Sequence, residues 1–160
     1  ESKDWGEYAI AKAFMFYSIF TVVALFISGL LIDKFTSVKL LPFLNIPLFL
    51  GLIILVFLKH PYSAFVFMGF LGVTNGLSNV LLSSLWAEIY GVNHLGSIKA
   101  LSGSLMVFST ALATAVFGLL IDAEYTIENI AALCSLYIVV SMLLILIFQK
   151  KYKPILQNKT

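Results

Sequence analysis

Two asparagines and a serine recur every four residues inside a long apolar stretch of this sequence. Asn75, Asn79 and Ser83 are each about one helical turn apart, so in a helix they form a single polar stripe. A carboxamide that faced hydrocarbon would lack hydrogen-bond partners at a high cost in free energy, so the stripe must face protein or water. Hydrogen bonds to a neighbouring helix would explain it. The number of polar residues on this one helix favours the alternative, which is the wall of a polar pathway.

A second, thinner polar stripe lies near the start of the chain. Tyr17, Thr21, Ala24 and Ser28 are spaced by four, three and four residues, which again places them on one helical face. Tyr17 and Thr21 are the candidates for contact with a solute in the same pathway. A purely structural role is the alternative, because a hydroxyl can donate a hydrogen bond to a carbonyl one turn earlier in its own helix.

Charged residues gather where the apolar segments end. An acid at such a position can lie against the positive N-terminal end of a neighbouring helix. We expect a gating region on one side of the membrane, and ordinary interfacial charge placement is the alternative. The charged residues concerned are Asp33, Lys34, Lys39, Glu88 and Lys99, and Gly29, four residues before Asp33, belongs to the same set.

The sequence predicts no catalytic residue, metal site, cofactor or nucleic-acid partner. His60 and His94 fall in breaks on opposite sides, and no acidic pair lies in the middle of an apolar segment. The single cysteine, Cys134, excludes a disulfide framework within the chain. A net charge of +2 is too small and too dispersed to attract nucleic acid.

The elements that carry these residues are predicted to be membrane-spanning helices. Apolar residues make up 61% of the chain, charged residues 11%, and the mean hydropathy is +1.02. A soluble fold of this size would have too little polar surface to cover such a core, so lipid is the expected solvent. Five segments reach the length of about 20 residues that a spanning helix needs. They run over residues 9–32, 40–58, 62–86, 98–121 and 130–148. The short links between them predict an all-α, polytopic transmembrane bundle of antiparallel neighbours.

The distribution of lysines predicts the orientation. Short cytoplasmic loops carry an excess of lysine and arginine. One side collects Lys34, Lys39, Lys99, Lys150, Lys151, Lys153 and Lys159, and the other has Lys3, Lys12 and Lys59 with most of the acids. We therefore expect the N-terminus outside and the C-terminus in the cytoplasm.

Prolines and small residues mark particular points in the spans. Pro42 and Pro47 predict a kink or a loose first turn in the second span. Small residues at helical spacing allow two helices in lipid to approach closely, so we expect them to pack against other helices. They form two sets, Gly69, Gly72 and Gly76 in the third span and Thr110, Thr114 and Gly118 in the fourth.

The chain begins without an initiator methionine and has no signal peptide ahead of its first apolar segment. We expect it to be a piece of a longer protein that continues on the N-terminal side.

Two segments resemble the major facilitator superfamily of transporters. "SGLLIDKFTSVK" is similar to the family's loop signature, a glycine followed by an acid four residues on and then a base. "LWAEIYGVNHLGSIKALSGSLMVFSTALATAVFGLLID" resembles the tenth-to-eleventh helix region of bacterial members near the monocarboxylate and oxalate–formate exchangers. The signature departs from the usual pattern at Thr36, where a glycine is common, and in retaining only Lys39 of the closing pair of bases.

The resemblance covers residues 14–148 and implies that the five spans are helices eight to twelve of a twelve-helix protein. The third span would then line the central cavity, and Gly29, Asp33 and Lys34 would belong to a cytoplasmic latch between two halves. The partners that it implies are the lipid bilayer, the missing N-terminal helices, and a small solute such as a proton or an organic anion. The implied location is the bacterial inner membrane.

Two other functions stay open beside a secondary transporter that works by alternating access. One is a small polytopic scaffold or assembly protein with no transport activity. The other is a membrane-embedded enzyme, for which only the stripe of Asn75, Asn79 and Ser83 could house a polar group at depth.

Overall fold

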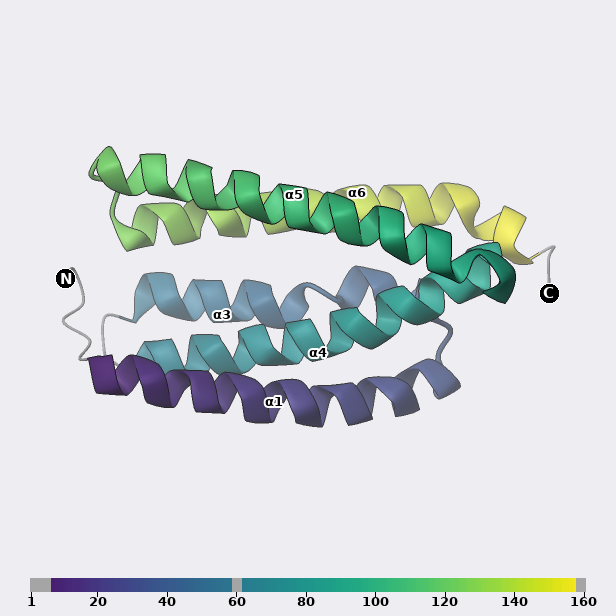
Figure 1. Cartoon of the computed structure of the whole chain (residues 1–160), viewed down its shortest axis with the longest axis horizontal. Coiled ribbons are helices and arrows are strands. Elements are labelled where there is room, and N and C mark those ends of the chain that lie inside the picture. The colour runs from purple at the N-terminus through teal and green to yellow at the C-terminus, as the bar shows by residue number, and fades with distance from the viewer. Residues whose placement is uncertain (1–6, 59–61, 158–160) are drawn as a thin grey trace.

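The computed structural model describes residues 7–58 and 62–157, and over these ranges the chain is helical with short connections and no strand. Figure 1 shows long helices running side by side along one axis. Their bounds are α1 Glu7–Lys34, α2 Ser37–Leu40, η1 Leu41–Phe43, α3 Ile46–Phe57, α4 Tyr62–Tyr90, η2 Val92–His94, α5 Leu95–Asp122 and α6 Ile127–Gln157.

Five helical segments are long and apolar enough to cross a membrane, which confirms the predicted fold class. They are Ala11–Lys34, Ser37–Phe57, Tyr62–Tyr90, Val92–Asp122 and Ile127–Phe148. The second begins three residues earlier than predicted. The third continues four residues beyond Trp86, so Glu88 lies on the last turn of α4 and not in a loop.

The second span is broken near its start, as the prolines predicted. Pro42 lies in the 3₁₀ helix η1, and the regular helix α3 starts only at Ile46, with Pro47 in its first turn. Proline has no backbone N–H and its ring clashes with the preceding turn, so it is tolerated only near a helix start. The break divides the span into the short helix α2 and the longer helix α3.

Helices α1 and α4 pack against each other more closely than any other pair, because glycines line the contact. A β-carbon on Gly76 would lie 2.6 Å from the carbonyl oxygen of Thr21 and 2.7 Å from the β-carbon of Ala24. One on Gly72 would overlap the carbonyl oxygen of Tyr17. The packing predicted for these two glycines is thus confirmed, and the stripe that carries Tyr17 and Thr21 is the face of α1 that meets α4.

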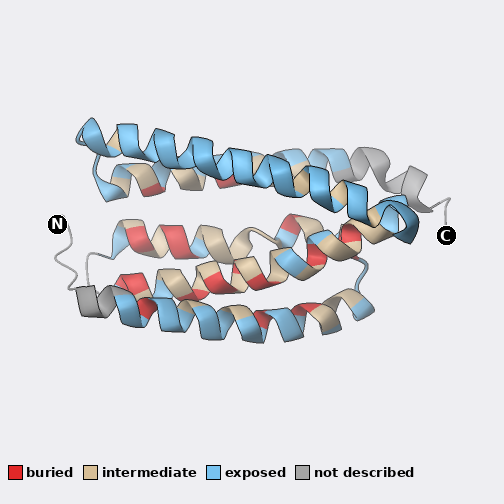
Figure 2. Cartoon of the chain, in the orientation of Figure 1, coloured by how far each residue is buried: buried red, intermediate tan, exposed pale blue. Residues whose placement is uncertain are grey.

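A different kind of contact joins α3 to α6. Leu52 and Leu55 of α3 form a buried cluster with Ala131 and Ile138 of α6. Figure 2 shows the buried residues gathered in the middle of the bundle, on α3, α4 and the facing sides of α1 and α6. Aliphatic interdigitation, and not backbone proximity, holds this second pair together.

Helix α5 has no buried residue. Thr110, Thr114 and Gly118 are exposed, and a β-carbon on Gly118 would have nothing within 4 Å. The prediction that this set packs against another helix is therefore wrong within the described chain. The sequence pattern shows that a face can be packed closely, but it does not show whether a partner is present.

Candidate functional site

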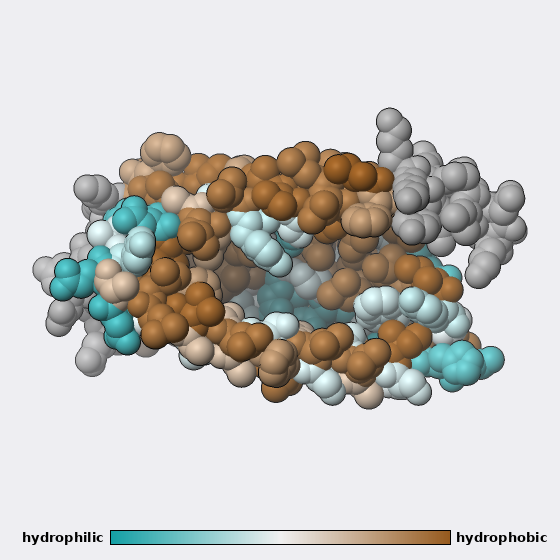
Figure 3. Space-filling view, turned by 90° about the horizontal axis from the view of Figure 1, so that it is seen from above, coloured by the Kyte–Doolittle hydropathy of each residue, from teal (hydrophilic) through white to brown (hydrophobic). Residues whose placement is uncertain are grey.

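A groove of about 530 Å³ opens between α1 and α4. We call it the α1–α4 groove. Figure 3 shows that one face of the molecule is hollowed, with apolar side chains along the rims and polar ones deep inside. The residues that line the groove come from both helices. They are Phe14, Tyr17, Met68, Leu71, Thr74, Asn75 and Ser78.

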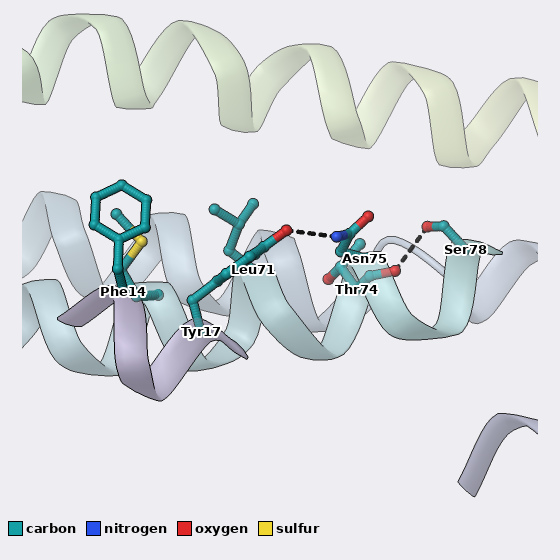
Figure 4. Close-up of a pocket in the computed structure, with 7 residues that line it drawn as sticks. Phe14, Tyr17, Leu71, Thr74, Asn75 and Ser78 are labelled. Atoms are coloured by element: carbon teal, nitrogen blue, oxygen red, sulfur yellow. Dashed lines mark hydrogen bonds between the residues drawn. The ribbon is translucent and has the colours of Figure 1, made fainter. Parts of the chain in front are cut away.

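Three side chains form a hydrogen-bonded relay along this groove. Asn79 donates from Nδ2 to the side-chain Oδ1 of Asn75 at 3.2 Å and to its backbone carbonyl at 2.9 Å. Asn75 in turn donates from Nδ2 to the hydroxyl oxygen of Tyr17 on α1, at 2.5 Å (Figure 4). We call these residues the polar relay. Its bond from Asn75 to Tyr17 joins two spans, α4 and α1.

Local sequence explains why these side chains meet. Asn75 lies between Gly72 and Gly76, which let the backbone of α4 approach the backbone of α1. Tyr17 is one of the residues whose carbonyl touches this glycine face, so its ring starts close to α4 and can extend toward Asn75.

The hydroxyl groups around the relay are satisfied within their own helices. Thr74 donates to the carbonyl of Phe70 at 3.0 Å, and Ser78 donates to the carbonyl of Thr74 at 2.7 Å. Thr21 donates to the carbonyl of Tyr17 at 2.7 Å. Thr21 therefore makes the intrahelical bond that the structural alternative described, and this half-buried residue does not line the groove.

The predicted pathway residues are thus only partly brought together. Tyr17 and Asn75 line the groove, and Asn79 is exposed and joins them through its carboxamide. Ser83 lies one turn further along α4. It is half-buried, it does not line the groove, and its hydroxyl makes no hydrogen bond to the described part of the chain.

Three lining residues were missed by the sequence-based prediction. Phe14, Met68 and Leu71 are apolar, so nothing in a search for polar stripes selects them. Their spacing carried the signal: Phe14 is three residues before Tyr17, and Met68 and Leu71 are seven and four residues before Asn75. Each therefore shares a helical face with a relay residue.

The candidate gating residues lie at the opposite end of α1 from Phe14. Glu88 accepts a hydrogen bond from the backbone N–H of Ser37 at 3.1 Å, so its carboxylate lies at the start of α2. We expected Asp33 to be an acid that could play such a role. Asp33 is exposed, and no ion pair or hydrogen bond involves its carboxylate within the described ranges.

The other residues of this set make few contacts. The Lys34 ammonium lies 5.6 Å from the centre of the Phe35 ring, and Lys39 and Lys99 are exposed. Gly29 is half-buried, and an added β-carbon would have nothing within 4 Å. Glu88 and Lys99 form no ion pair in the described structure, and the carboxylate of Glu88 is bonded to the backbone of Ser37 instead.

The groups that the groove presents are hydrogen-bonding and apolar. Among the described residues, no three His, Cys, Asp or Glu side chains are close enough together to hold a metal ion. The groove is lined by uncharged residues that offer hydrogen bonds and apolar contact.

Comparison with known proteins identifies a family. The model of the family described as the Major Facilitator Superfamily matches residues 2–160. No curated protein and no solved structure matches the chain significantly.

Proposed function

This chain belongs to the Major Facilitator Superfamily, whose members are membrane transporters, and we propose that it forms one wall of the solute pathway in a secondary active transporter. In this proposal a small solute is held near the bilayer midplane, between this wall and helices that the chain does not contain. Alternating access then exposes the solute to either side of the membrane in turn.

The observation that carries the proposal is the polar relay in the α1–α4 groove. Polar groups in the hydrocarbon core of a membrane need hydrogen-bond partners. They are therefore tolerated where they are buried in protein or line a water-filled cavity. Asn75 and Tyr17 are hydrogen-bonded to each other, but Asn79 is exposed and Ser78 also faces the groove. A bond between two helices does not need these further polar groups, and their oxygens suit a hydrated pathway.

The exposure of α5 supports the presence of further helices. An isolated span in lipid needs no partner to satisfy its backbone, but α5 also carries threonines and glycines at helical spacing and leaves them uncovered. We propose that the five spans are helices eight to twelve of a major facilitator fold, in a branch near the monocarboxylate and oxalate–formate exchangers. The preceding helices of the same transporter would cover α5.

We also propose that the link from Glu88 to Ser37 belongs to the cytoplasmic gate. It joins the end of α4, which carries the relay, to the start of the second span. The lysines at this end of the bundle favour the cytoplasmic side of a bacterial inner membrane by the positive-inside rule. Gly29, Asp33, Lys34, Lys39 and Lys99 would act at the same gate once the other helices are in place.

Cysteine accessibility tests the pathway without knowledge of the solute. The natural cysteine is first removed by Cys134→Ser, and a single cysteine is then introduced as Asn79→Cys or, as a control, as Phe26→Cys on the exposed face of α1. A thiol reacts as its thiolate, which forms in water and not in hydrocarbon. In membranes of expressing cells, we expect a membrane-impermeant thiosulfonate to label the cysteine at position 79 and to leave the one at position 26 unlabelled. Equal labelling rates at positions 79 and 26 would contradict the proposed pathway.

Reconstitution separates a transporter wall from a self-sufficient protein. Because one wall cannot enclose a solute, the purified chain in liposomes should take up no solute from a mixture of labelled sugars, amino acids and carboxylates. Uptake by the chain alone would contradict the proposal that other helices complete the pathway. If the protein were instead a scaffold with no solute pathway, the cysteine introduced by Asn79→Cys would not react with the thiosulfonate.

A further inference from the structure

The polar atoms that remain available in the α1–α4 groove include two hydroxyl oxygens that can act as hydrogen-bond acceptors. Thr74 and Ser78 each have one hydroxyl proton, and each gives it to a carbonyl of α4. Their oxygens keep lone pairs that can accept a further bond. Asn79 does not line the groove, and its Nδ2 group is used on Asn75.

The relay ends in a single hydroxyl donor. Asn75 donates to the Tyr17 hydroxyl oxygen, and the phenol proton of Tyr17 is therefore directed elsewhere. Figure 4 shows this hydroxyl at the end of the Tyr17 side chain, pointing toward Asn75 and away from α1. Asn75 keeps a second Nδ2 proton, because a carboxamide has two and only one is given to Tyr17. A ligand in the groove would thus meet two donors, on Tyr17 and Asn75, and two acceptors, on Thr74 and Ser78.

None of the described residues that line this groove carries a charge. An anion buried against this wall would meet no cation, so its charge would be left uncompensated. A cation would likewise meet no carboxylate among these residues. An uncharged molecule that both donates and accepts hydrogen bonds fits the wall without either cost.

The remaining lining is apolar. Phe14, Met68 and Leu71 provide one aromatic and two aliphatic surfaces beside the relay. Binding pockets commonly combine a mainly apolar wall with a few polar groups that fix orientation. A ring compound that has C–H faces and a rim of hydroxyl groups has the same division between apolar and polar surface.

We propose that the α1–α4 groove binds a neutral, polyhydroxylated solute of monosaccharide size. Its hydroxyl groups donate to Thr74 and Ser78 and accept from Tyr17, and its C–H face packs on Phe14. This inference rests on the proposed transport function and narrows it. It disfavours the organic anion that the resemblance implied, as far as this wall of the pathway is concerned.

Protection of a cysteine in the groove tests the proposal. In the Cys134→Ser background, Leu71→Cys places a thiol on the wall without altering the relay, and Met68→Cys serves as a second reporter if the first variant is poorly expressed. The probes are D-glucose and D-glucuronate, which share a ring and differ by one carboxylate. At ten times a millimolar Kd, glucose should slow thiosulfonate labelling by about tenfold. Glucuronate at the same concentration should leave the rate unchanged.

A relay variant separates specific binding from crowding. Tyr17→Phe removes the hydroxyl donor, and loss of one hydrogen bond should weaken protection by glucose about 2–10-fold. The control is Ser18→Ala, which removes a hydroxyl from the exposed side of α1 and should leave protection unchanged.

The possible failures are distinguishable. Equal or better protection by glucuronate, or labelling that glucose does not slow, would overturn this inference and leave the pathway intact. A thiol at positions 71 and 68 that does not react at all would contradict the pathway itself, and with it both proposals.

Discussion

The contact between α1 and α4 predicts that adding one methyl group at Gly76 destabilises the protein. The added β-carbon would lie 2.6 Å from the Thr21 carbonyl oxygen and 2.7 Å from the Ala24 β-carbon. Neither neighbour is the flexible end of a side chain, so the two helices must move apart. Overpacking of this kind costs about 1–3 kcal/mol. Alanine is favoured over glycine in a helix by about 1 kcal/mol, which offsets part of this cost. At the upper overpacking cost of about 3 kcal/mol, the net loss of stability is therefore about 2 kcal/mol.

The same substitution at Gly118 is the matched control. Gly118 is also within a helix, but an added β-carbon there has nothing within 4 Å. Gly118→Ala should therefore keep the helix-propensity gain of about 1 kcal/mol. For a chain of this size the two variants should shift the melting temperature in opposite directions, with about 2–4 °C for each kcal/mol.

The single cysteine provides the assay. Cys134 is partly buried, so its reaction with a fluorogenic maleimide during heating in detergent reports unfolding. We expect Gly76→Ala to melt below the parent chain and Gly118→Ala at or above it. Melting of Gly76→Ala at the temperature of Gly118→Ala would refute the close approach of α1 to α4 at this position.

Three further predictions follow from the described contacts. Tyr17→Phe should reduce stability in the same thermal assay by about 0.6 kcal/mol, which is the average for a hydrogen bond between membrane helices. A loss above about 2 kcal/mol would mean that the substitution disturbs the packing of the ring and does not merely remove the hydrogen bond. Glu88→Ala should accelerate amide hydrogen exchange at Ser37, whereas Asp33→Asn should not, because the Glu88 carboxylate accepts a bond from the Ser37 N–H and the Asp33 carboxylate accepts none in the described structure; equal effects would contradict the assignment. Ile138 is 6% exposed and Leu136 is 66% exposed, so Ile138→Ala should lower the melting temperature more than Leu136→Ala. The first substitution leaves a cavity of the kind that costs about 2–5 kcal/mol in soluble cores. Equal losses would rule out the α3–α6 cluster as a stabilising contact.

The number of spans and the break in the second one could be predicted from the sequence for simple physical reasons. Hydrocarbon thickness fixes how many apolar residues a helix needs, and five segments meet that length. Pro42 and Pro47 cannot occupy a helix interior without loss of a hydrogen bond, so the regular helix begins only at Ile46. The close packing at Gly72 and Gly76 was also predicted, because few other roles suit glycines at that spacing in a membrane helix.

The pairing of helices could not be predicted, because hydropathy does not distinguish lipid from protein as the neighbour of an apolar face. Helix α5 illustrates this. Its threonines and Gly118 match the pattern of a packed face, yet they are exposed within the described chain. In water an uncovered apolar face would signal a missing partner at once. In lipid the same face is stable, and only the small residues on it suggest that a partner exists.

The candidate site was predicted in part for a related reason. Tyr17 and Asn75 were selected because they are polar at membrane depth, and they do meet. Ser83 was selected by the same argument but lies beyond the groove, because a stripe on one long helix passes more than one neighbour along its length. Glu88 was selected as an acid at the end of an apolar segment, and its partner, the Ser37 amide, is a backbone group that no pattern of charges reveals.

The packing of α1 on α4 and the geometry of the groove are one feature of this chain. Gly72 and Gly76 flank Asn75 in the sequence, and they bring the α4 backbone against the carbonyls of Tyr17 and Thr21. With bulkier residues there the helices would stand further apart, and the Tyr17 hydroxyl would no longer reach the Asn75 carboxamide at 2.5 Å. The glycines therefore set the spacing at which the relay closes, and the relay in turn fixes which polar atoms face the groove. Stability lost at this contact should be accompanied by a change in the groove, whereas stability lost in the α3–α6 cluster should not.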